Sequence, residues 1–337
     1  MPTLRKRLLV DQWVIISSQR ASRPRQLRLG RRPADGRCPF CPGDTAITPP
    51  PIDHWQSPAF PDDPWGVQVV PNKYPSLLDG AGSGDEMPDT AVDGLYQSQP
   101  GFGAHEVFIE APQHHCDWAS LPPRHIAVIF EAWRQRIAAV SSTDQPACAI
   151  CFKNHGATAG ATLEHVHSQL MAPPLVVPQL RDELRGARLF YEEHHCCALC
   201  EMLQHERGSG ERIIAENASA TAVAPFGSRM PYEAWILPRD HQDDFRRATA
   251  SQLRDLATLT LQVLAAYDQL FEPLCYNLIL HTVPFDLAGE PYYHWHLEML
   301  PRSGQIAGLE LGSDLFVHAT ASEVAAQQLR QRIGSPG

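Results

Sequence analysis

Two stretches of the chain share one order of hydrophobic and polar positions. In the first, a short apolar segment follows residue 106, apolar residues recur at helical spacing over 124–140, and a second apolar run covers 147–152. Short apolar runs favour strands, whereas a spacing of three to four favours a helix. The first stretch therefore predicts strand, helix and strand. The same segments return later, with a strand from residue 233, a helix over 251–270 and a strand over 276–281.

Each stretch then closes on a His-x-His pair, at residues 165–167 and 294–296. The two pairs are 129 positions apart (294 − 165), and the histidines that follow each first strand, His114 and His241, are 127 apart (241 − 114). Near-constant offsets indicate a duplication, although chance similarity of two such runs is the alternative. We therefore expect an α+β protein with largely antiparallel sheets and helices packed on them. Its two similar halves would be residues 1–185 and residues 186–337.

The segment from His165 to Gln169 places two histidines and a glutamine at alternate positions. On a strand, residues i, i+2 and i+4 point to one face, so His165, His167 and Gln169 would lie side by side. Neighbouring side chains of this set would be roughly 6–7 Å apart, since a strand rises about 3.3 Å per residue. One imidazole can then bind a metal while the next carries out chemistry.

The composition excludes several classes of protein. The 337 residues are 43% hydrophobic and 20% charged, which is ordinary for a globular protein of about two domains. A net charge of −10 disfavours non-specific binding to nucleic acid, which requires a basic surface. The chain has no run of about 18 apolar residues for a membrane span, and its N-terminus lacks the apolar core of a signal peptide. Nine cysteines in that setting favour free or metal-bound thiols in the cytoplasm.

Each half also contains a Cys-x-x-Cys motif, and zinc prefers cysteine thiolates and histidine imidazoles as ligands. The duplication gives each half two cysteines, one histidine after its first strand and one histidine from its His-x-His pair. The two Cys₂His₂ sets are Cys38, Cys41, His114 and His165, and Cys197, Cys200, His241 and His294. Four protein ligands leave no open position, so both zinc ions would be structural.

Other residues compete with these assignments. His115 and Cys196 each neighbour a chosen ligand, but the repeat and the spacing favour the residues chosen. Reduced cysteines in a helix are the alternative for the second motif. A third motif, Cys148 and Cys151, lies in an expected buried strand. Residues i and i+3 of a strand point to opposite faces, so we expect these two cysteines to be core residues.

With His165 assigned to metal, His167 beside it is a candidate nucleophile. Histidine attack on phosphorus splits one transfer into two easier steps. Gln169 is neutral and can hydrogen-bond charged phosphoryl oxygens without repelling them. Residues 153–160 upstream are small, polar and glycine-rich, and such a loop lets backbone N–H groups approach phosphate. A plain hairpin connection is the alternative for this loop.

Seven motifs spread over nearly the whole chain match one known family. They are Asp11-Gln12-Trp13-Val14, Arg20-Ala21-Ser22-Arg23-Pro24, Cys38-Pro39-Phe40-Cys41, Val70-Pro71-Asn72-Lys73-Tyr74-Pro75, Phe152-Lys153-Asn154-His155-Gly156, His165-Val166-His167-Ser168-Gln169 and Pro238-Arg239-Asp240-His241. With these motifs the chain resembles the galactose-1-phosphate uridylyltransferases, within the histidine-triad-like nucleotidyltransferases. The resemblance implies two histidine-triad-like halves.

The resemblance also implies roles for individual residues. His167 would be the nucleophile that becomes uridylylated. Gln169 would contact the phosphoryl group, and it separates transferases from triad hydrolases, which carry a third histidine there. The implied nucleotide and phosphate contacts are Arg20, Arg23, Asn72, Asn154, Gly156 and Thr162. Surface charge is the alternative for the two arginines. On the sugar side the match is Glu310, and His296 would line the sugar-phosphate side of the pocket or pack structurally.

The implied reaction is a ping-pong exchange. UDP-glucose binds, His167 attacks the α-phosphorus, and glucose 1-phosphate leaves. Galactose 1-phosphate then takes the UMP from His167. The expected partners are therefore a UDP-hexose and a hexose 1-phosphate, without nucleic acid or membrane. Members of the family often dimerise, so a homodimer is an open option.

Some positions depart from the family pattern. Leu309 stands where an aromatic residue usually precedes the sugar-contacting glutamate, and a lysine that some members use nearby is absent. The chain also resembles the branch that includes ADP-glucose phosphorylases, which move AMP and use phosphate as acceptor. A zinc-stabilised nucleotide-binding protein without activity is a further alternative, and Gln169 disfavours a dinucleoside-polyphosphate hydrolase. A second active site at His296 is disfavoured, because Trp295 is bulky and no glycine-rich loop precedes it.

Overall fold

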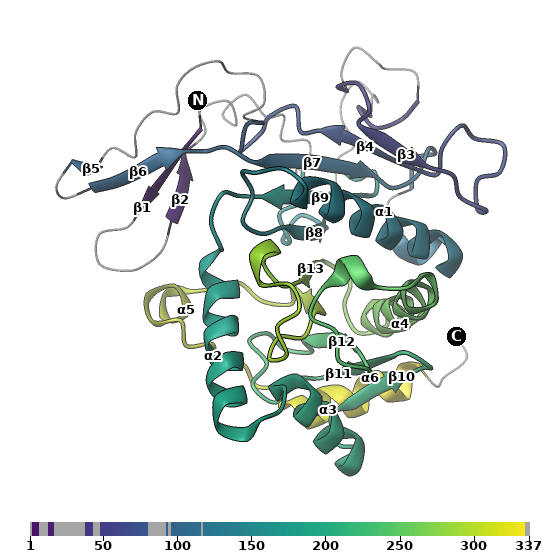
Figure 1. The fold of residues 1–337 in the computed structure, drawn as a ribbon. Helices are drawn as coiled ribbons and strands as arrows, with labels where there is room; N and C mark the ends of the chain where they lie inside the picture. The colour runs from purple at the N-terminus through teal and green to yellow at the C-terminus, as the bar shows by residue number, and fades with distance from the viewer. Residues whose placement is uncertain are drawn as a thin grey trace.

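The computed structural model describes residues 2–6, 13–16, 38–42, 48–79, 92–93, 96–115 and 117–333. Its centre is one ten-stranded sheet that both halves share (Figure 1). Every neighbouring pair of its strands is antiparallel. In spatial order the strands are β10 (Ile213–Glu216), β11 (Ala220–Val223), β12 (Ala234–Pro238), β14 (His296–Pro301), β13 (Tyr276–His281), β8 (Ile150–His155), β9 (His167–Ala172), β7 (Ala104–Ile109), β4 (Val67–Pro71) and β3 (Asp53–Trp55).

The strand order is symmetric about its middle, where β8 pairs antiparallel with β13. Moving outward from that pair, β9 corresponds to β14, β7 to β12, β4 to β11 and β3 to β10. This order confirms the predicted α+β fold of two similar antiparallel halves, and it adds that the two halves are joined through one sheet. The predicted boundary between residues 185 and 186 falls inside the connecting helix α2 (Pro178–His194) and remains a prediction.

A smaller antiparallel sheet lies beside the first half (Figure 1). Its strands are β2 (Trp13–Ile16), β1 (Thr3–Lys6), β6 (Tyr96–Pro100) and β5 (Val92–Asp93). The remaining helices are α1 (Pro123–Ser141), α3 (Ala198–Ser209), α4 (Ala250–Asp268), α5 (Gly308–Ser313) and α6 (Ser322–Ile333). Among the residues that the structure describes, no helix is long and apolar enough to cross a membrane.

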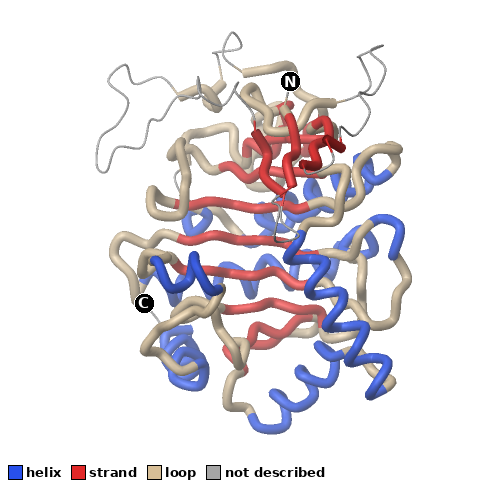
Figure 2. The backbone as a smooth tube through the Cα atoms, turned by 90° about the vertical axis from the view of Figure 1, so that its left-hand side faces the viewer, coloured by secondary structure: helices blue, strands red, loops and turns tan. Residues whose placement is uncertain are grey.

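Helices α1 and α4 cover one face of the large sheet, and α2 crosses the other face (Figure 2). The apolar residues of α1 recur at helical spacing and are fully buried: Ile126, Ile129, Phe130, Trp133 and Ile137. They belong to one core that also takes in α4, where Leu256, Leu259 and Val263 are fully buried. Burying these faces stabilises both helices, at about 1.5–3 kcal/mol for each large apolar side chain.

Both predicted central helices are confirmed within two residues, as is the strand 276–281. Helix α4 begins at a capping box in which Thr249 accepts from Gln252 N at 3.3 Å and Gln252 accepts from Thr249 N at 2.8 Å. The strand predicted over 147–152 lies three residues later, as β8. Strand β9 begins only at His167, so His165 precedes the strand instead of sharing it. A contact with the carbonyl oxygen of Ala111 orients its imidazole ring.

Candidate active site and metal centres

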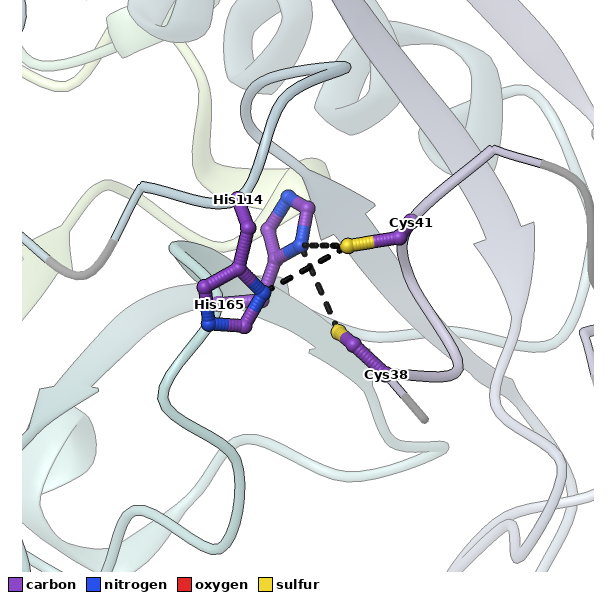
Figure 3. Close-up of side chains that lie close together, drawn as sticks. All are labelled: Cys38, Cys41, His114 and His165. Atoms are coloured by element: carbon purple, nitrogen blue, oxygen red, sulfur yellow. Dashed lines mark hydrogen bonds between the residues drawn. The ribbon is translucent and has the colours of Figure 1, made fainter. Parts of the chain in front are cut away.

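The first Cys/His set converges on one point (Figure 3). The ligand-type atoms of its four residues all lie within 4.8 Å of one another. Sγ of Cys38 is 3.5 Å from Nδ1 of His165, and Sγ of Cys41 is 3.4 Å from Nδ1 of His114 and 3.6 Å from Nδ1 of His165. Zinc–sulfur and zinc–nitrogen bonds of about 2.3 and 2.05 Å give a tetrahedral S···N edge of about 3.6 Å. The set therefore has the size of a zinc site.

Backbone groups orient these ligands. The two cysteines lie on a turn closed by Cys41 N donating to Cys38 O at 3.3 Å. Nε2 of His165 lies 2.8 Å from the carbonyl oxygen of Ala111, two residues after β7. A carbonyl can only accept, so Nε2 carries the proton and Nδ1 presents its lone pair to the two sulfurs.

The protonation states of the four ligand residues also favour binding of a cation between them. Burial lowers the pKa of His165 to about 4, so its imidazole is neutral and able to bind metal at ordinary pH. Burial and the neighbouring Cys38 raise the pKa of Cys41 to about 11. Two thiolates therefore do not form side by side unless a cation compensates their charge.

The second Cys/His set repeats this arrangement. The ligand-type atoms of Cys197, Cys200, His241 and His294 also lie within 4.8 Å of one another. Sγ of Cys200 is 3.4 Å from Nδ1 of His241 and 3.4 Å from Nδ1 of His294. Nε2 of His294 lies 3.1 Å from Pro238 O, 127 positions after the equivalent Ala111. This motif is nevertheless built differently from the first, because Cys197 caps α3 and Cys200 lies in its first turn.

The third Cys-x-x-Cys motif follows the expectation of core cysteines. Cys148 and Cys151 are both fully buried, and they belong to two different hydrophobic clusters. Burial raises the pKa of Cys148 to about 11 and that of Cys151 well above its ordinary value. Both sulfurs are therefore neutral thiols.

A contact with a backbone carbonyl fixes the tautomer of His167. The residue is 5% exposed, and its Nδ1 lies 2.8 Å from the carbonyl oxygen of His165. That carbonyl can only accept, so Nδ1 carries the proton and the lone pair is on Nε2. The ring of Phe40, from the first cysteine turn, lies 5.3 Å away centroid to centroid. The first Cys/His set and the candidate nucleophile thus share the segment 165–167, and Phe40 contacts the rings of both His165 and His167.

A buried ion pair lies next to the segment 165–167, on the face of the large sheet that α1 and α4 cover. Lys153 and Glu110 are 2% and 0% exposed, and Nζ of Lys153 lies 2.6 Å from Oε2 of Glu110. Nζ also donates to the carbonyl oxygen of His167 at 3.0 Å, and Nε1 of Trp118 donates to the same Glu110 oxygen at 2.7 Å. Lys153 therefore connects the start of β9 to the end of β7.

The glycine-rich loop lines a cavity of about 400 Å³ together with His165 and His167. Gly156 has a φ of +80°, and a Cβ there would lie 2.2 Å from Sγ of Cys275, so only glycine fits without a shift. Asn154 in the same cavity accepts from Nδ2 of Asn277 at 2.7 Å. Asn277 lies on β13, so the second half orients Asn154, which precedes the glycine-rich loop of the first half.

Asn72 and Gln169 meet on the other side of His167. Nδ2 of Asn72 lies 3.4 Å from Oε1 of Gln169, and Nε2 of His105 lies 3.0 Å from the same oxygen. Asn72 and His105 also line a larger cavity of about 640 Å³. The structure therefore brings Asn72, Asn154, Gly156, His167 and Gln169 into one region.

His296, the counterpart of His167, has different surroundings. The residue is 3% exposed, and its ring stacks on that of His281 with the centroids 4.6 Å apart. His281 lies between two carboxylates, 3.1 Å from Glu183 and 3.5 Å from Glu298. Burial by itself would lower the pKa of His281, but the two carboxylates raise it to about 10. The ligand-type atoms of Glu183, His281 and His296 lie within 4.8 Å of one another, but an imidazole that holds its proton up to about pH 10 is a cation and not a metal ligand.

The remaining expected substrate contacts are Glu310, Thr162, Arg20 and Arg23. Glu310 is on α5, where its carboxylate accepts from Ala307 N at 3.0 Å and is used within its own helix. Thr162 is half-buried in the loop that leads to His165. Arg20 and Arg23 lie outside the described residues.

Three residues that contact Gln169 or His296, or lie beside them, were not predicted as site residues from the sequence: His105, Glu183 and His281. The repeat offers a partial signal for one of them, because His281 ends β13 as His155 ends β8. Nothing in the local sequence distinguishes Glu183, which comes from α2. Its contact with His281 depends on how that helix crosses the sheet.

In each half of the duplicated fold, a His-x-His pair lies beside a Cys/His set. The family model "Galactose-1-phosphate uridyl transferase, N-terminal domain" matches residues 1–176, and the corresponding C-terminal domain model matches residues 183–333. The chain belongs to this family of enzymes.

Relatives with two activities are similar over nearly the full length. ADP-glucose phosphorylase of Arabidopsis thaliana is 33% identical over 98% of this chain and 93% of its own. Galactose-1-phosphate uridylyltransferase of Thermotoga maritima is 28% identical over 98% of both. The crystal structure of the Arabidopsis phosphorylase with bound ADP-glucose superposes with a TM-score of 0.77 at 30% identity, covering 98% of each chain. A structure of a uridylyltransferase gives a TM-score of 0.80 at 28% identity, covering 99% of this chain and 98% of its own.

Proposed function

We propose that this enzyme transfers a nucleoside monophosphate from a nucleoside-diphosphate sugar to an acceptor, through a covalent intermediate on His167. The observation that carries the proposal is the bond of His167 Nδ1 to the His165 carbonyl. It places the imidazole lone pair on Nε2, the nitrogen that would attack phosphorus, in a ring that lines the same cavity as the glycine-rich loop.

In the first step, Nε2 of His167 attacks the α-phosphorus. A P–N bond forms, the P–O bond to the distal phosphate breaks, and the sugar 1-phosphate leaves with that electron pair. In the second step, an oxygen of the acceptor attacks the same phosphorus and the P–N bond breaks. Gln169 and the backbone N–H groups of the loop from Asn154 to Thr158 would hydrogen-bond the phosphoryl oxygens.

Zinc in the two Cys₂His₂ sets fits this proposal as a structural element. Cys38, Cys41, His114 and His165 would hold one ion, and the matching set of the second half would hold the other. Bound zinc would fix the backbone next to His167 through its ligand His165. The proton positions and the attack depend on the chain's own residues.

The nucleotide and acceptor define two candidates. The first is UMP exchange between UDP-glucose and galactose 1-phosphate, as in the galactose-1-phosphate uridylyltransferases. The second is an ADP-glucose phosphorylase activity, with AMP transferred to phosphate. The higher identity of the Arabidopsis phosphorylase favours the second candidate. Leu309, in place of an aromatic residue, and the use of Glu310 within its own helix depart from the uridylyltransferase pattern.

The decisive experiment is the intact mass of the protein after incubation with UDP-glucose or with ADP-glucose. A UMP adduct supports the first candidate and an AMP adduct the second. Inorganic phosphate and galactose 1-phosphate are then added separately, to identify the acceptor that removes the adduct.

Substitution of the two counterpart histidines locates the adduct. His167→Ala should abolish it, whereas His296→Ala should retain it, because His296 is stacked on His281 in the second half. Absence of an adduct with both nucleotide sugars, in protein that retains its metal, would contradict the proposal.

A further inference from the structure

His105 connects Gln169 to a backbone N–H group. It lies on β7, next to β9, and its side chain is 6% exposed. Its Nδ1 lies 2.9 Å from Ser76 N, and its Nε2 lies 3.0 Å from Oε1 of Gln169. These contacts form a chain from a backbone amide, through an imidazole, to the side-chain amide two residues after His167.

Ser76 fixes the direction of this chain. A backbone N–H can only donate, so Nδ1 of His105 must accept and carries no proton. A neutral imidazole then carries its proton on Nε2. Since Nε2–H donates, the Gln169 atom that faces it must be the carbonyl oxygen. The reversed amide would place two donors against each other.

Asn72 supports the same orientation independently. The backbone N–H of Tyr74 donates to Oδ1 of Asn72 at 2.9 Å, so Nδ2 is the donor end of that side chain. Nδ2 lies 3.4 Å from Oε1 of Gln169. It also lies 3.0 Å from Nε2 of His105; with Nε2 protonated, both nitrogens of that contact are donors, so it is not a hydrogen bond. The backbone N–H groups of Ser76 and Tyr74 thus determine which end of the Gln169 amide faces His105 and Asn72. That end is the carbonyl oxygen, Oε1.

We propose that His105 is a positioning residue for nucleotidyl transfer. It holds Gln169 with the carbonyl oxygen turned toward β7, so that the NH₂ group is the end presented to the phosphoryl group at His167. His105 does not touch the reacting atoms and acts through Gln169. This inference rests on the function proposed above and extends it to how the site recognises the phosphoryl group.

The orientation matters because the two ends of an amide have opposite polarity. The non-bridging oxygens of the α-phosphoryl group are negative, so an NH₂ group stabilises them and a carbonyl oxygen repels them. A glutamine without this contact would sample both orientations. Fixing the donor end beforehand removes that reorganisation from the transfer step.

The test is a double-mutant cycle on the rate at which His167 takes up nucleotide from the reactive nucleotide sugar. His105→Leu removes the donor and should slow the step about 10-fold, with apparent affinity changed less than about 3-fold. His105→Gln retains an N–H near the position of Nε2 and should restore most of the rate. In a Gln169→Ala background, itself about 100-fold slower, His105→Leu should cause no further loss.

A purely structural role for His105 gives a different pattern. Equal losses in both backgrounds, or no recovery with His105→Gln, would overturn the inference.

A second measurement requires no catalysis. Nitrogen-15 NMR of histidine-labelled protein shows which ring nitrogen of His105 is protonated, with its resonance identified by its absence in His105→Gln. A proton on Nε2 alone at neutral pH supports the inference, and a proton on Nδ1 overturns it, even if His105→Leu fails to fold. If no adduct forms but the proton is on Nε2, the proposed function fails while the orientation of Gln169 stands.

Discussion

At the residue scale, Gly156 and Gly160 illustrate two separate reasons why a position requires glycine: a positive φ and a lack of space for a Cβ. Both have a positive φ, +80° and +84°, but only Gly156 has a neighbour where a Cβ would lie, at 2.2 Å from Sγ of Cys275. Gly160→Ala should therefore cost about 1–2 kcal/mol from backbone strain alone. Gly156→Ala should cost the same strain and about 1–3 kcal/mol more, because the added carbon overpacks against Cys275. Urea unfolding measures both costs.

Cys275 provides the control for that comparison. Cys275→Ala removes the sulfur and should recover part of the loss in Gly156→Ala, while leaving Gly160→Ala unchanged. Recovery stays partial, because Cβ of Cys275 is 3.0 Å from the added carbon. Equal costs for the two glycines would show that the contact with Cys275 is relieved at no cost.

Lys153 gives a second residue-scale prediction. Burial lowers the pKa of Lys153 and Glu110 opposes that shift, so the two charges depend on each other. Lys153→Met leaves the Glu110 carboxylate buried without its cation and should lower the free energy of unfolding by about 3–5 kcal/mol. Adding Glu110→Gln should recover most of that loss.

The control is the exposed pair of Arg188 and Glu192 on α2, whose side chains are 67% and 55% exposed. Arg188→Met should cost less than about 1 kcal/mol. If Lys153→Met costs no more than this, the buried pair does not stabilise the fold.

At the scale of the element, the three Cys-x-x-Cys motifs differ in what surrounds them. The first lies on a turn, the second at the start of α3, and the third in the core beside and within β8. We predict that Cys38→Ser and Cys200→Ser each lose one zinc per chain relative to the unchanged protein. Cys148→Ser should lose none. Metal content after dialysis, measured by mass spectrometry, tests all three, and a loss with Cys148→Ser would contradict the assignment.

At the scale of the whole molecule, the shared sheet should make the two halves unfold together. Leu278 on β13 is fully buried, and it pairs with Lys153 of β8 across the junction of the halves. Leu278→Ala should cost about 2–5 kcal/mol. Hydrogen exchange should report the same loss for β7 in the first half as for β12 in the second.

Leu189, on α2 and 60% exposed, is the control, and Leu189→Ala should change stability by less than about 0.5 kcal/mol. If Leu278→Ala lowers protection only in β12, the halves unfold separately.

Much of the site follows from local sequence because its ligands come from short motifs. Cys38-x-x-Cys41, His165-x-His167 and the offset to the second half are enough to group eight ligands into two sets, and the geometry is compatible with both. The ends of strands were less predictable. His165 precedes β9, and its Nε2–H donates to the carbonyl oxygen of Ala111, 54 positions earlier, a contact that no local pattern predicts.

The sequence by itself determined the duplication, the α+β class, the Cys/His sets and the candidate nucleophile, because each depends on spacing within a few residues or on a repeated order. Only the tertiary structure decided that the halves share one sheet, that Asn277 reaches Asn154 across it, and that His296 stacks on His281. It also decided the contact of His105 with Gln169, 64 positions apart. These contacts depend on strand register and on the path of the chain across the sheet, and neither leaves a periodic trace in the sequence.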